Sequence, residues 1–331
     1  MRLRAISSVL PEWRVDNETI SKWSGLEVAT IQDKLGVTGR RFLTHEETTS
    51  GLAAQAVEKL LQDNVDLAKE DIDILVVVTQ NPDYKLPHVS ALLQDSLGLK
   101  SSIAAFDINL GCSGYVYALS TVKGMMLGEG MKNAVLVTCD PYSKIMAREN
   151  RDVIGLFGDG ATASWISAEQ GGEIGFGDYG TDGSGAEHLI VKSGGATLPN
   201  DNLDGNATAE SSDAEGHLHM NGRAIFNFMM TGVPGTVDRC LERNSLTRED
   251  VDLFVFHQAN AFMLKGVAKK MRLPMDKVPI NMEERGNTVS SSIPFVLGDF
   301  LPDRKLAGKK VLICGFGVGL SWATNIISFP N

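Results

Sequence analysis

The hydrophobic pattern of the chain alternates between short apolar runs and longer segments with helical spacing. The runs are rich in Val, Ile and Phe and predict buried strands, while apolar residues three or four positions apart predict helices. Such an alternation is typical of an α/β protein. Strands are expected at 72–79, 103–108, 134–139, 161–167, 253–256, 310–314 and 321–328, and helices at 51–63, 88–97, 113–127, 222–244, 260–272 and 289–301.

Three expected strands in the second half of the chain repeat the pattern of three strands in the first half. The matched pairs are 71–78 with 250–256, 133–138 with 309–314, and 160–167 with 319–326. Because they occur in the same order, they indicate a duplicated α/β unit. We therefore expect one half at 1–170 and the other at 171–331. The polar segment 193–216 has little periodicity and is expected to form a long surface loop or flap.

Composition narrows the class of protein. Of the 331 residues, 43% are hydrophobic and 22% are charged, which is an ordinary globular balance. The net charge of −10 argues against non-specific binding to nucleic acid. No apolar run is long enough to span a bilayer, and the apolar stretch at the N-terminus ends at Pro11, so neither a membrane span nor a secretory signal is expected.

The cysteines and histidines do not suggest a metal site or a disulfide framework. The four cysteines are not paired at zinc spacing and are too few to stabilise a chain of this size. A reducing cytoplasm fits this cysteine usage best. Apart from His257, the histidines have no metal-like partners in the sequence. We expect no metal and no cofactor.

Cys112 is the most informative of these residues. It lies in Gly111-Cys112-Ser113-Gly114, between the expected strand 103–108 and the expected helix 113–127. The positive end of a helix dipole favours the thiolate, which is the reactive form of cysteine. The two glycines allow a sharp turn and a close approach of a substrate to the backbone. A small buried structural cysteine is the alternative, and residues elsewhere in the chain decide between them.

Two further polar residues stand in similar positions. His257 follows the expected strand 253–256 and precedes a helix, while Asn287 lies in a glycine turn that leads into another helix. Ligands bind at this edge of α/β sheets, so the three side chains are expected to meet there. Taken singly, the histidine would be structural and the asparagine a turn or capping residue.

The ordered set of motifs resembles the β-ketoacyl-acyl-carrier-protein synthase III family of the thiolase superfamily. The resemblance covers almost the whole chain, and it is the order of the motifs that makes it specific. The matching stretches are Ala105-Phe-Asp, Gly111-Cys-Ser-Gly-Tyr, Phe157-Gly-Asp-Gly-Ala, Met220-Asn-Gly-Arg, His257-Gln-Ala-Asn, Arg285-Gly-Asn-Thr and Gly315-Phe-Gly-Val-Gly-Leu-Ser-Trp.

This resemblance implies a fold and a reaction. The fold would be two similar α/β halves packed as five αβαβα layers. Cys112 would take the acyl group of a thioester, and the backbone N–H groups of Cys112 and Val318 would form the oxyanion hole. His257 and Asn287 would donate hydrogen bonds to a malonyl-type thioester during decarboxylative Claisen condensation. The substrates would be acyl-carrier-protein or coenzyme A thioesters.

The resemblance also implies a homodimer, in which the segment 84–88, with Leu86, reaches the acyl pocket of the partner. Three departures from the family pattern point to a dedicated biosynthetic pathway, of fatty-acid or polyketide type, and not to the initiation of ordinary fatty-acid synthesis. The family's Trp that stacks on adenine is missing from residues 27–32, although its partner Arg151 is present. Phe262 replaces a carrier-docking Arg, and Val318 replaces a common Gly.

The helix after His257 carries a basic stripe. Lys265, Lys269 and Arg272 are four and then three positions apart, with Lys270 beside them. Acyl carrier proteins are acidic, so we expect this stripe to dock the carrier, the alternative being an ordinary solvated helix face. Two alternatives to the condensation remain: acyl transfer to an oxygen or nitrogen without decarboxylation, and a silent dimer partner of an active synthase. Cys112 argues against the silent partner, and Asn287 favours condensation.

Overall fold

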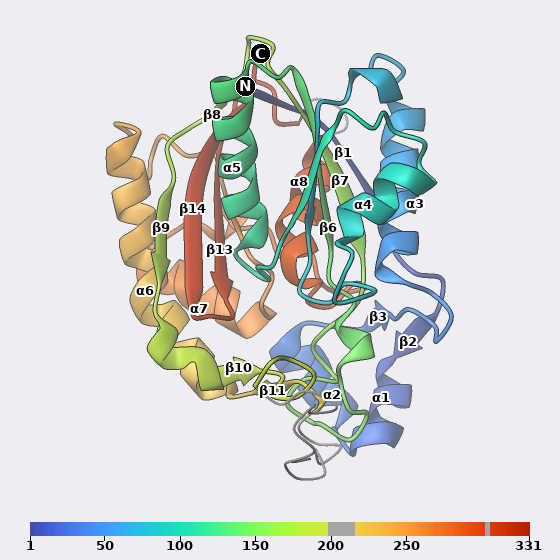
Figure 1. Ribbon diagram of the computed structural model, residues 1–331. Helices are drawn as coiled ribbons and strands as arrows, with labels where there is room; N and C mark the ends of the chain where they lie inside the picture. Colours follow the sequence, from blue (N-terminus) through green and yellow to red (C-terminus); the bar gives the residue numbers. More distant parts are fainter. Residues whose placement is uncertain (198–215, 302–304) are drawn as a thin grey trace.

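The protein consists of five packed layers, which Figure 1 shows edge-on. The computed structural model describes residues 1–197, 216–301 and 305–331. Two sheets enclose a central layer of helices, and further helices cover the outer face of each sheet. The central layer holds α5 (Gly114–Glu129) and α8 (Ser292–Phe300), and the outer layers hold α3 (Thr49–Asp63) with α4 (Val89–Ser96), and α6 (Gly222–Arg243) with α7 (Ala261–Met271).

The two sheets have three corresponding strands in the same order. The first runs β1-β7-β6-β4-β5, with β4, β5 and β6 parallel and β7 antiparallel to β6. The second runs β12-β13-β14-β8, with β12 and β13 parallel and β9 also paired with β14. The strands are β1 (Arg2–Val9), β4 (Ile74–Val78), β5 (Ala104–Ile108), β6 (Asn133–Cys139), β7 (Ala161–Ser167), β8 (Glu173–Ile174), β9 (Asp178–Thr181), β12 (Leu253–Phe256), β13 (Lys310–Gly317) and β14 (Ser321–Ser328).

The matched sequence pairs occupy equivalent places in the two sheets: β4 with β12, β6 with β13, and β7 with β14. The αβαβα fold expected from the family resemblance is thus the observed one. The division at residue 170 stays a prediction, because α5 and α8 lie between both sheets within one packed body.

Strand β4 shows how the sequence builds these layers. All five of its residues are buried. Ile74, Val76 and Val78 pack into the central layer, while Leu75 and Val77 pack under α3 and α4. Successive side chains of a strand point to opposite faces, so only a continuous apolar run can fill both layers. Each such side chain contributes about 1.5–3 kcal/mol when fully buried.

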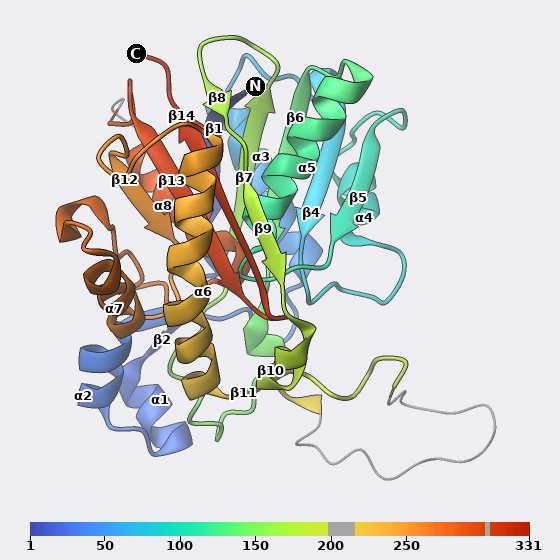
Figure 2. The same ribbon diagram turned by 90° about the vertical axis from the view of Figure 1, so that its left-hand side faces the viewer.

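Smaller elements surround the end of the molecule where the parallel strands finish (Figure 2). They are β2 (Arg14–Asp16), α1 (Asn17–Ser24), α2 (Val28–Thr30), the π-helical turn η1 (Ile31–Leu35), β3 (Gly39–Arg41), β10 (Leu189–Ile190) and β11 (His219–Met220), with the 3-10 turns η3 (Tyr142–Lys144), η4 (Gly183–His188) and η7 (Val289–Ser291). Two further 3-10 turns, η2 (Lys69–Asp71) and η6 (Met275–Lys277), lie near the opposite end, where β4 and β12 begin. No helix of the described ranges is long and apolar enough to cross a membrane.

Every expected strand and helix is present, and the differences lie at the ends. The helix expected over 289–301 begins as the turn η7 and continues as α8, and β13 runs three residues beyond 314. Strand β1 has no counterpart among the expected elements, because an edge strand with mostly half-buried residues lacks a continuous apolar run. Of the expected loop 193–216, residues 198–215 lie outside the described part of the chain, and 193–197 form neither helix nor strand.

Candidate active site

Cys112 lies in the turn between strand β5 and helix α5, as the sequence predicts. The chain turns through Gly111, whose carbonyl accepts a hydrogen bond from the Gly114 N–H (2.8 Å), and α5 begins at Gly114. The thiol is buried, with 4% of the residue exposed. A Cβ atom on Gly317 would lie 2.7 Å from Cys112 Sγ, so this position must be glycine for the thiol to fit.

The protonation of Cys112 differs from the expected thiolate. Burial raises the pKa of the Cys112 thiol to about 12, and the charge of the buried Asp140 acts in the same direction. Hydrogen bonds from the backbone N–H groups of Val318 and of Cys112 itself lower this pKa. Desolvation therefore outweighs the helix terminus, and the resting group is a thiol. These are the same two N–H groups that are expected to form the oxyanion hole.

His257 lies at the end of β12, where its backbone N–H donates to Cys314 O in β13 (2.8 Å). Burial lowers the pKa of the imidazole to about 3, and a hydrogen bond with the backbone of Val289 opposes this effect. The ring is therefore neutral at physiological pH. Its Nδ1 atom lies 2.7 Å from Ser292 Oγ, and its edge packs against the Phe316 ring at 5.6 Å between centroids.

Asn287 faces the other nitrogen of the same ring. Its Nδ2 lies 3.4 Å from His257 Nε2, and its Oδ1 accepts from the Val289 N–H at 2.9 Å. Val289 has a φ of 53°, a left-handed conformation that costs a β-branched residue about 1–2 kcal/mol. This turn orients the Asn287 amide so that its Nδ2 faces the His257 ring and also lies 3.5 Å from Ala259 O.

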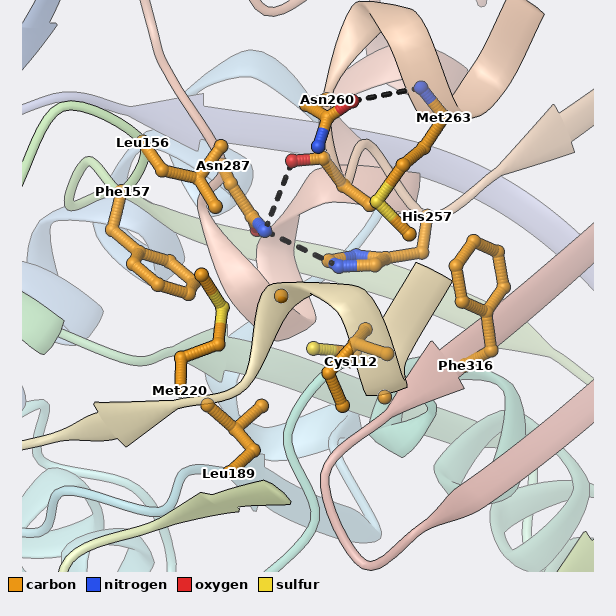
Figure 3. A pocket seen from close by; sticks show the side chains of 14 residues that line it. Cys112, Leu156, Phe157, Leu189, Met220, His257, Asn260, Met263, Asn287 and Phe316 are labelled. Atoms are coloured by element: carbon orange, nitrogen blue, oxygen red, sulfur yellow. Dashed lines mark hydrogen bonds between the residues drawn. The ribbon is translucent and has the colours of Figure 1, made fainter. Parts of the chain in front are cut away.

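The three predicted residues share one pocket. Cys112, His257 and Asn287 line one cleft, and Figure 3 shows their side chains directed toward it. Its other walls are mostly apolar and come from both halves of the chain. They include Leu156, Phe157, Leu189, Met220, Ile225, Met263 and Phe316. A nucleophile and two neutral donors in a mostly apolar cleft suit the chemistry of an acyl thioester.

The residues expected to bind substrate or carrier lie outside this cleft. Phe262 and Leu86 are exposed, at 61% and 82%, and Arg151 donates to Gly25 O at 3.3 Å. Lys265 and Lys269 are exposed on α7. Arg272 follows the last residue of this helix. The structure thus leaves these side chains accessible and does not bring them into contact with Cys112.

Three features of the site were not anticipated from the sequence. Asp140 is fully buried near Cys112 and accepts hydrogen bonds from the Gln80 N–H (2.6 Å) and from the Ser290 hydroxyl. Ser292 contacts the ring of His257. Trp23 stacks on the Arg148 guanidinium at 4.8 Å, close in sequence to Arg151. The run of three serines after Asn287 was the available sequence signal for the contact between Ser292 and His257. The burial of Asp140 and the stacking of Trp23 on Arg148 depend on contacts between distant segments.

The described residues contain no group of His, Cys, Asp or Glu side chains that could hold a metal ion.

Comparisons with known proteins agree with this geometry. The family model for 3-oxoacyl-[acyl-carrier-protein] synthase III matches residues 106–183, and its C-terminal counterpart matches residues 241–329. A β-ketoacyl-[acyl-carrier-protein] synthase III from Caldanaerobacter subterraneus is 32% identical, with 98% of this chain and 96% of the relative covered. A β-ketoacyl-[acyl-carrier-protein] synthase III from Lactobacillus helveticus is 33% identical, with 99% of this chain and 98% of the relative covered.

The chain belongs to the 3-oxoacyl-[acyl-carrier-protein] synthase III family. It is therefore a condensing enzyme of the acyltransferase class. Solved structures support this assignment: a 3-oxoacyl-(acyl-carrier-protein) synthase III is 38% identical with a TM-score of 0.92, covering 99% of both chains. The priming β-ketosynthase of the R1128 polyketide pathway is 26% identical with a TM-score of 0.89, covering 100% of this chain and 96% of that one.

Proposed function

We propose that this synthase III family member carries an acyl group on Cys112 and condenses it with a malonyl-type thioester. The observation that carries the proposal is the placement of Cys112, His257 and Asn287 around one buried, mostly apolar cleft. The acyl donor would be a thioester of an acyl carrier protein or of coenzyme A. No cofactor is required, because every bond change uses groups of the chain and the substrates.

In the first half-reaction the Cys112 thiol loses its proton and its sulfur attacks the carbonyl carbon of the acyl thioester. The Val318 and Cys112 N–H groups, whose hydrogen bonds lower the pKa of the Cys112 thiol, would donate to the developing oxyanion. Collapse of the intermediate breaks the bond to the departing thiolate, which takes up a proton. Loss of one such donor typically costs about 3–4 kcal/mol of barrier.

In the second half-reaction the malonyl-type thioester loses CO2, and the electrons of the broken C–C bond pass into an enolate. His257 Nε2 and Asn287 Nδ2 lie 3.4 Å apart, so one carbonyl oxygen can receive a hydrogen bond from both. The enolate carbon then attacks the acyl-Cys112 thioester, and the cysteine sulfur leaves and is protonated again. Since His257 and Asn287 are 2% and 3% exposed, their hydrogen bonds act in a low-dielectric site.

A specialised pathway of fatty-acid or polyketide type is part of the proposal. Its support is local: exposed Phe262 stands where the family pattern has a carrier-docking Arg, and the ring stacks on Phe226 at 5.7 Å. An aromatic pair with the exposed Lys265 and Lys269 nearby would bind a carrier by apolar contact and by charge.

We also propose a homodimer formed along the edge of the first sheet. Strand β5 is an edge strand in which every residue is half-buried, in contrast to fully buried β4. Leu127 of α5 and Phe176, between β8 and β9, are exposed at 64% and 58%, and Lys123 of α5 lies over the Phe176 ring. Exposed strand edges and apolar patches are typical of interfaces. A partner there would meet the exposed Leu86.

The experiment that tests the function separates the two half-reactions. His257→Ala and Asn287→Ala should still form the acyl adduct on Cys112 but should release CO2 from a malonyl thioester at least about a hundredfold more slowly. Intact-protein mass spectrometry measures the first step, and trapping of labelled CO2 measures the second. An Asn287→Ala enzyme that condenses at the normal rate would contradict the proposal and favour non-decarboxylative transfer to an oxygen or nitrogen acceptor.

A further inference from the structure

The run Ser290-Ser291-Ser292 tethers the Asn287 segment to three different places. The Ser290 hydroxyl binds Asp140, and the Ser291 hydroxyl binds Thr138 and Gly160 of the first half. Ser292 instead turns toward the second half and contacts His257. All three serines are buried. Ser292 is thus the only one of the three whose side chain contacts a residue of the proposed reaction.

The role of His257 depends on which nitrogen carries its single proton. A buried neutral imidazole donates through one nitrogen and accepts through the other. If the proton is on Nδ1, Nε2 accepts from Asn287 Nδ2 at 3.4 Å and cannot donate to a substrate. If it is on Nε2, both Nε2–H and Nδ2–H can donate to one thioester oxygen. Only the second tautomer supplies two donors to the cleft.

The contacts of Ser292 favour the second tautomer. In the part of the chain that the structure describes, its Oγ has two hydrogen-bond partners: it accepts from the Gln258 backbone N–H at 3.3 Å and lies 2.7 Å from His257 Nδ1. The Gln258 N–H can only donate. The hydroxyl proton of Ser292 therefore has one acceptor in reach, which is an unprotonated Nδ1. Burial of Ser292 at 2% exposure limits competition from water.

We propose that Ser292 is a positioning residue that donates its hydroxyl proton to His257 Nδ1 and so holds the imidazole proton on Nε2, facing the cleft. The proposal deepens the proposed function, since it concerns how His257 becomes a donor in the decarboxylation step. Asn287 Nδ2, 3.4 Å from Nε2, competes with this arrangement, because it can donate to Nε2 when the ring proton is on Nδ1. Without the Ser292 hydroxyl, this contact should leave Nδ1 protonated.

The test reads the tautomer directly. In full-length protein labelled with 15N in its histidine rings, protonated and unprotonated nitrogens give distinct NMR signals, and His257→Ala identifies those of His257. The wild type should carry its proton on Nε2, and Ser292→Ala should carry it on Nδ1. Ser292→Thr keeps the hydroxyl and should restore the wild-type pattern. Ser290→Ala, which removes the neighbouring hydroxyl bound to Asp140, should leave the tautomer unchanged.

A kinetic measurement accompanies the spectra. Ser292→Ala should slow CO2 release from a malonyl thioester about a hundredfold, which is the typical effect of losing one donor to the developing negative charge. Acylation of Cys112 should stay within about twofold, because it does not use the second donor. A proton on Nδ1 in the wild type, an unchanged tautomer in Ser292→Ala, or normal CO2 release by that variant would overturn the proposal. If Ser292→Ala does not fold, the wild-type spectrum still decides. If the wild type itself releases no CO2, the proposed function fails, while the spectra still test Ser292.

Discussion

At the scale of single residues, opposing effects set the pKa of the Cys112 thiol. Burial and the Asp140 carboxylate raise the pKa of the thiol, and two backbone N–H groups lower it. Asp140 is itself buried, and desolvation raises the pKa of its carboxyl group to about 6. Above pH 6 this carboxylate is charged and opposes ionisation of Cys112. Below that pH it is protonated and its effect disappears.

Asp140→Asn should therefore lower the pKa of Cys112 and speed its alkylation by iodoacetamide. The thiolate fraction rises about tenfold for each unit by which the thiol pKa falls. The ratio of the alkylation rate of the variant to that of the wild type should be near one at pH 5 and should rise as the pH passes 6. Peptide mapping measures the alkylation of Cys112 alone. Asp159→Asn is the matched control: its carboxyl group is also buried with a pKa of about 6, but it is not among the causes of the Cys112 shift. Equal rates for Asp140→Asn and wild type at pH 8 would refute this account.

Gly317→Ala should block acylation without unfolding the protein. The new Cβ would lie 2.7 Å from both Cβ and Sγ of Cys112, so the thiol must move away from the oxyanion donors. A displacement of about 1 Å can cost a hundredfold in rate. Gly298→Ala is the control, because its Cβ would meet Ile6 at an ordinary 3.5 Å. Acyl-adduct formation measured by mass spectrometry should fall about a hundredfold for the first variant only, and normal acylation of Gly317→Ala would show that the thiol site is not tightly packed.

At the scale of elements, helix α7 links the cleft to the outer surface. Met263 lines the cleft, whereas Phe262, Lys265 and Lys269 face solvent on the same helix. Lys265→Glu combined with Lys269→Glu should raise the KM for a carrier-bound substrate and spare a short pantetheine thioester. Charges at the rim of an interface act mainly on association, so the defect should shrink as salt rises.

The control for this pair is Lys59→Glu with Lys132→Glu, which makes the same change of charge on exposed residues of α3 and of the loop before β6. Equal losses for both substrates, or none for either, would mean that the α7 stripe does not dock a carrier.

The sequence predicted those elements whose residues are buried in a regular pattern. The continuous apolar run of β4 and the helical spacing of α5 are both set by neighbours on two sides, so periodicity identifies them. Periodicity did not identify β1 and β9, because these strands have no apolar run of their own. They form by pairing with β7 and β14. Short strands of this kind are determined by tertiary contacts.

The same distinction holds for the candidate site. Cys112, His257 and Asn287 could be predicted because each directly follows or precedes a strongly patterned element, so the topology brings them to one edge. The Asp140 contact with Ser290 joins residues 150 positions apart, and no local signal marks it. The thiolate expectation was wrong for a related reason: the helix terminus is visible in the sequence, but the extent of burial at Cys112 is a property of the fold.

At the scale of the whole molecule, the proposed homodimer can be tested directly. Wild-type protein should elute as a dimer in size-exclusion chromatography with light scattering at micromolar concentration. Leu127→Asp combined with Phe176→Asp places charge on two exposed apolar residues of the proposed interface and should shift the mass toward the monomer. Val65→Asp is the control, because Val65 is 90% exposed but lies in the loop between α3 and β4. A monomeric wild type would refute the dimer, and a dimer unaffected by the pair would place the interface elsewhere.

The most direct test of the central claim follows one acyl group through the full cycle. The enzyme is incubated with an acyl thioester, and intact-protein and peptide mass spectrometry locate the adduct. A malonyl thioester is then added. The account predicts an adduct on Cys112 that disappears as CO2 and a 3-oxoacyl thioester are released in equal amounts. An adduct on Cys139, Cys240 or Cys314, or an adduct on Cys112 that is cleared without CO2 release, would contradict it.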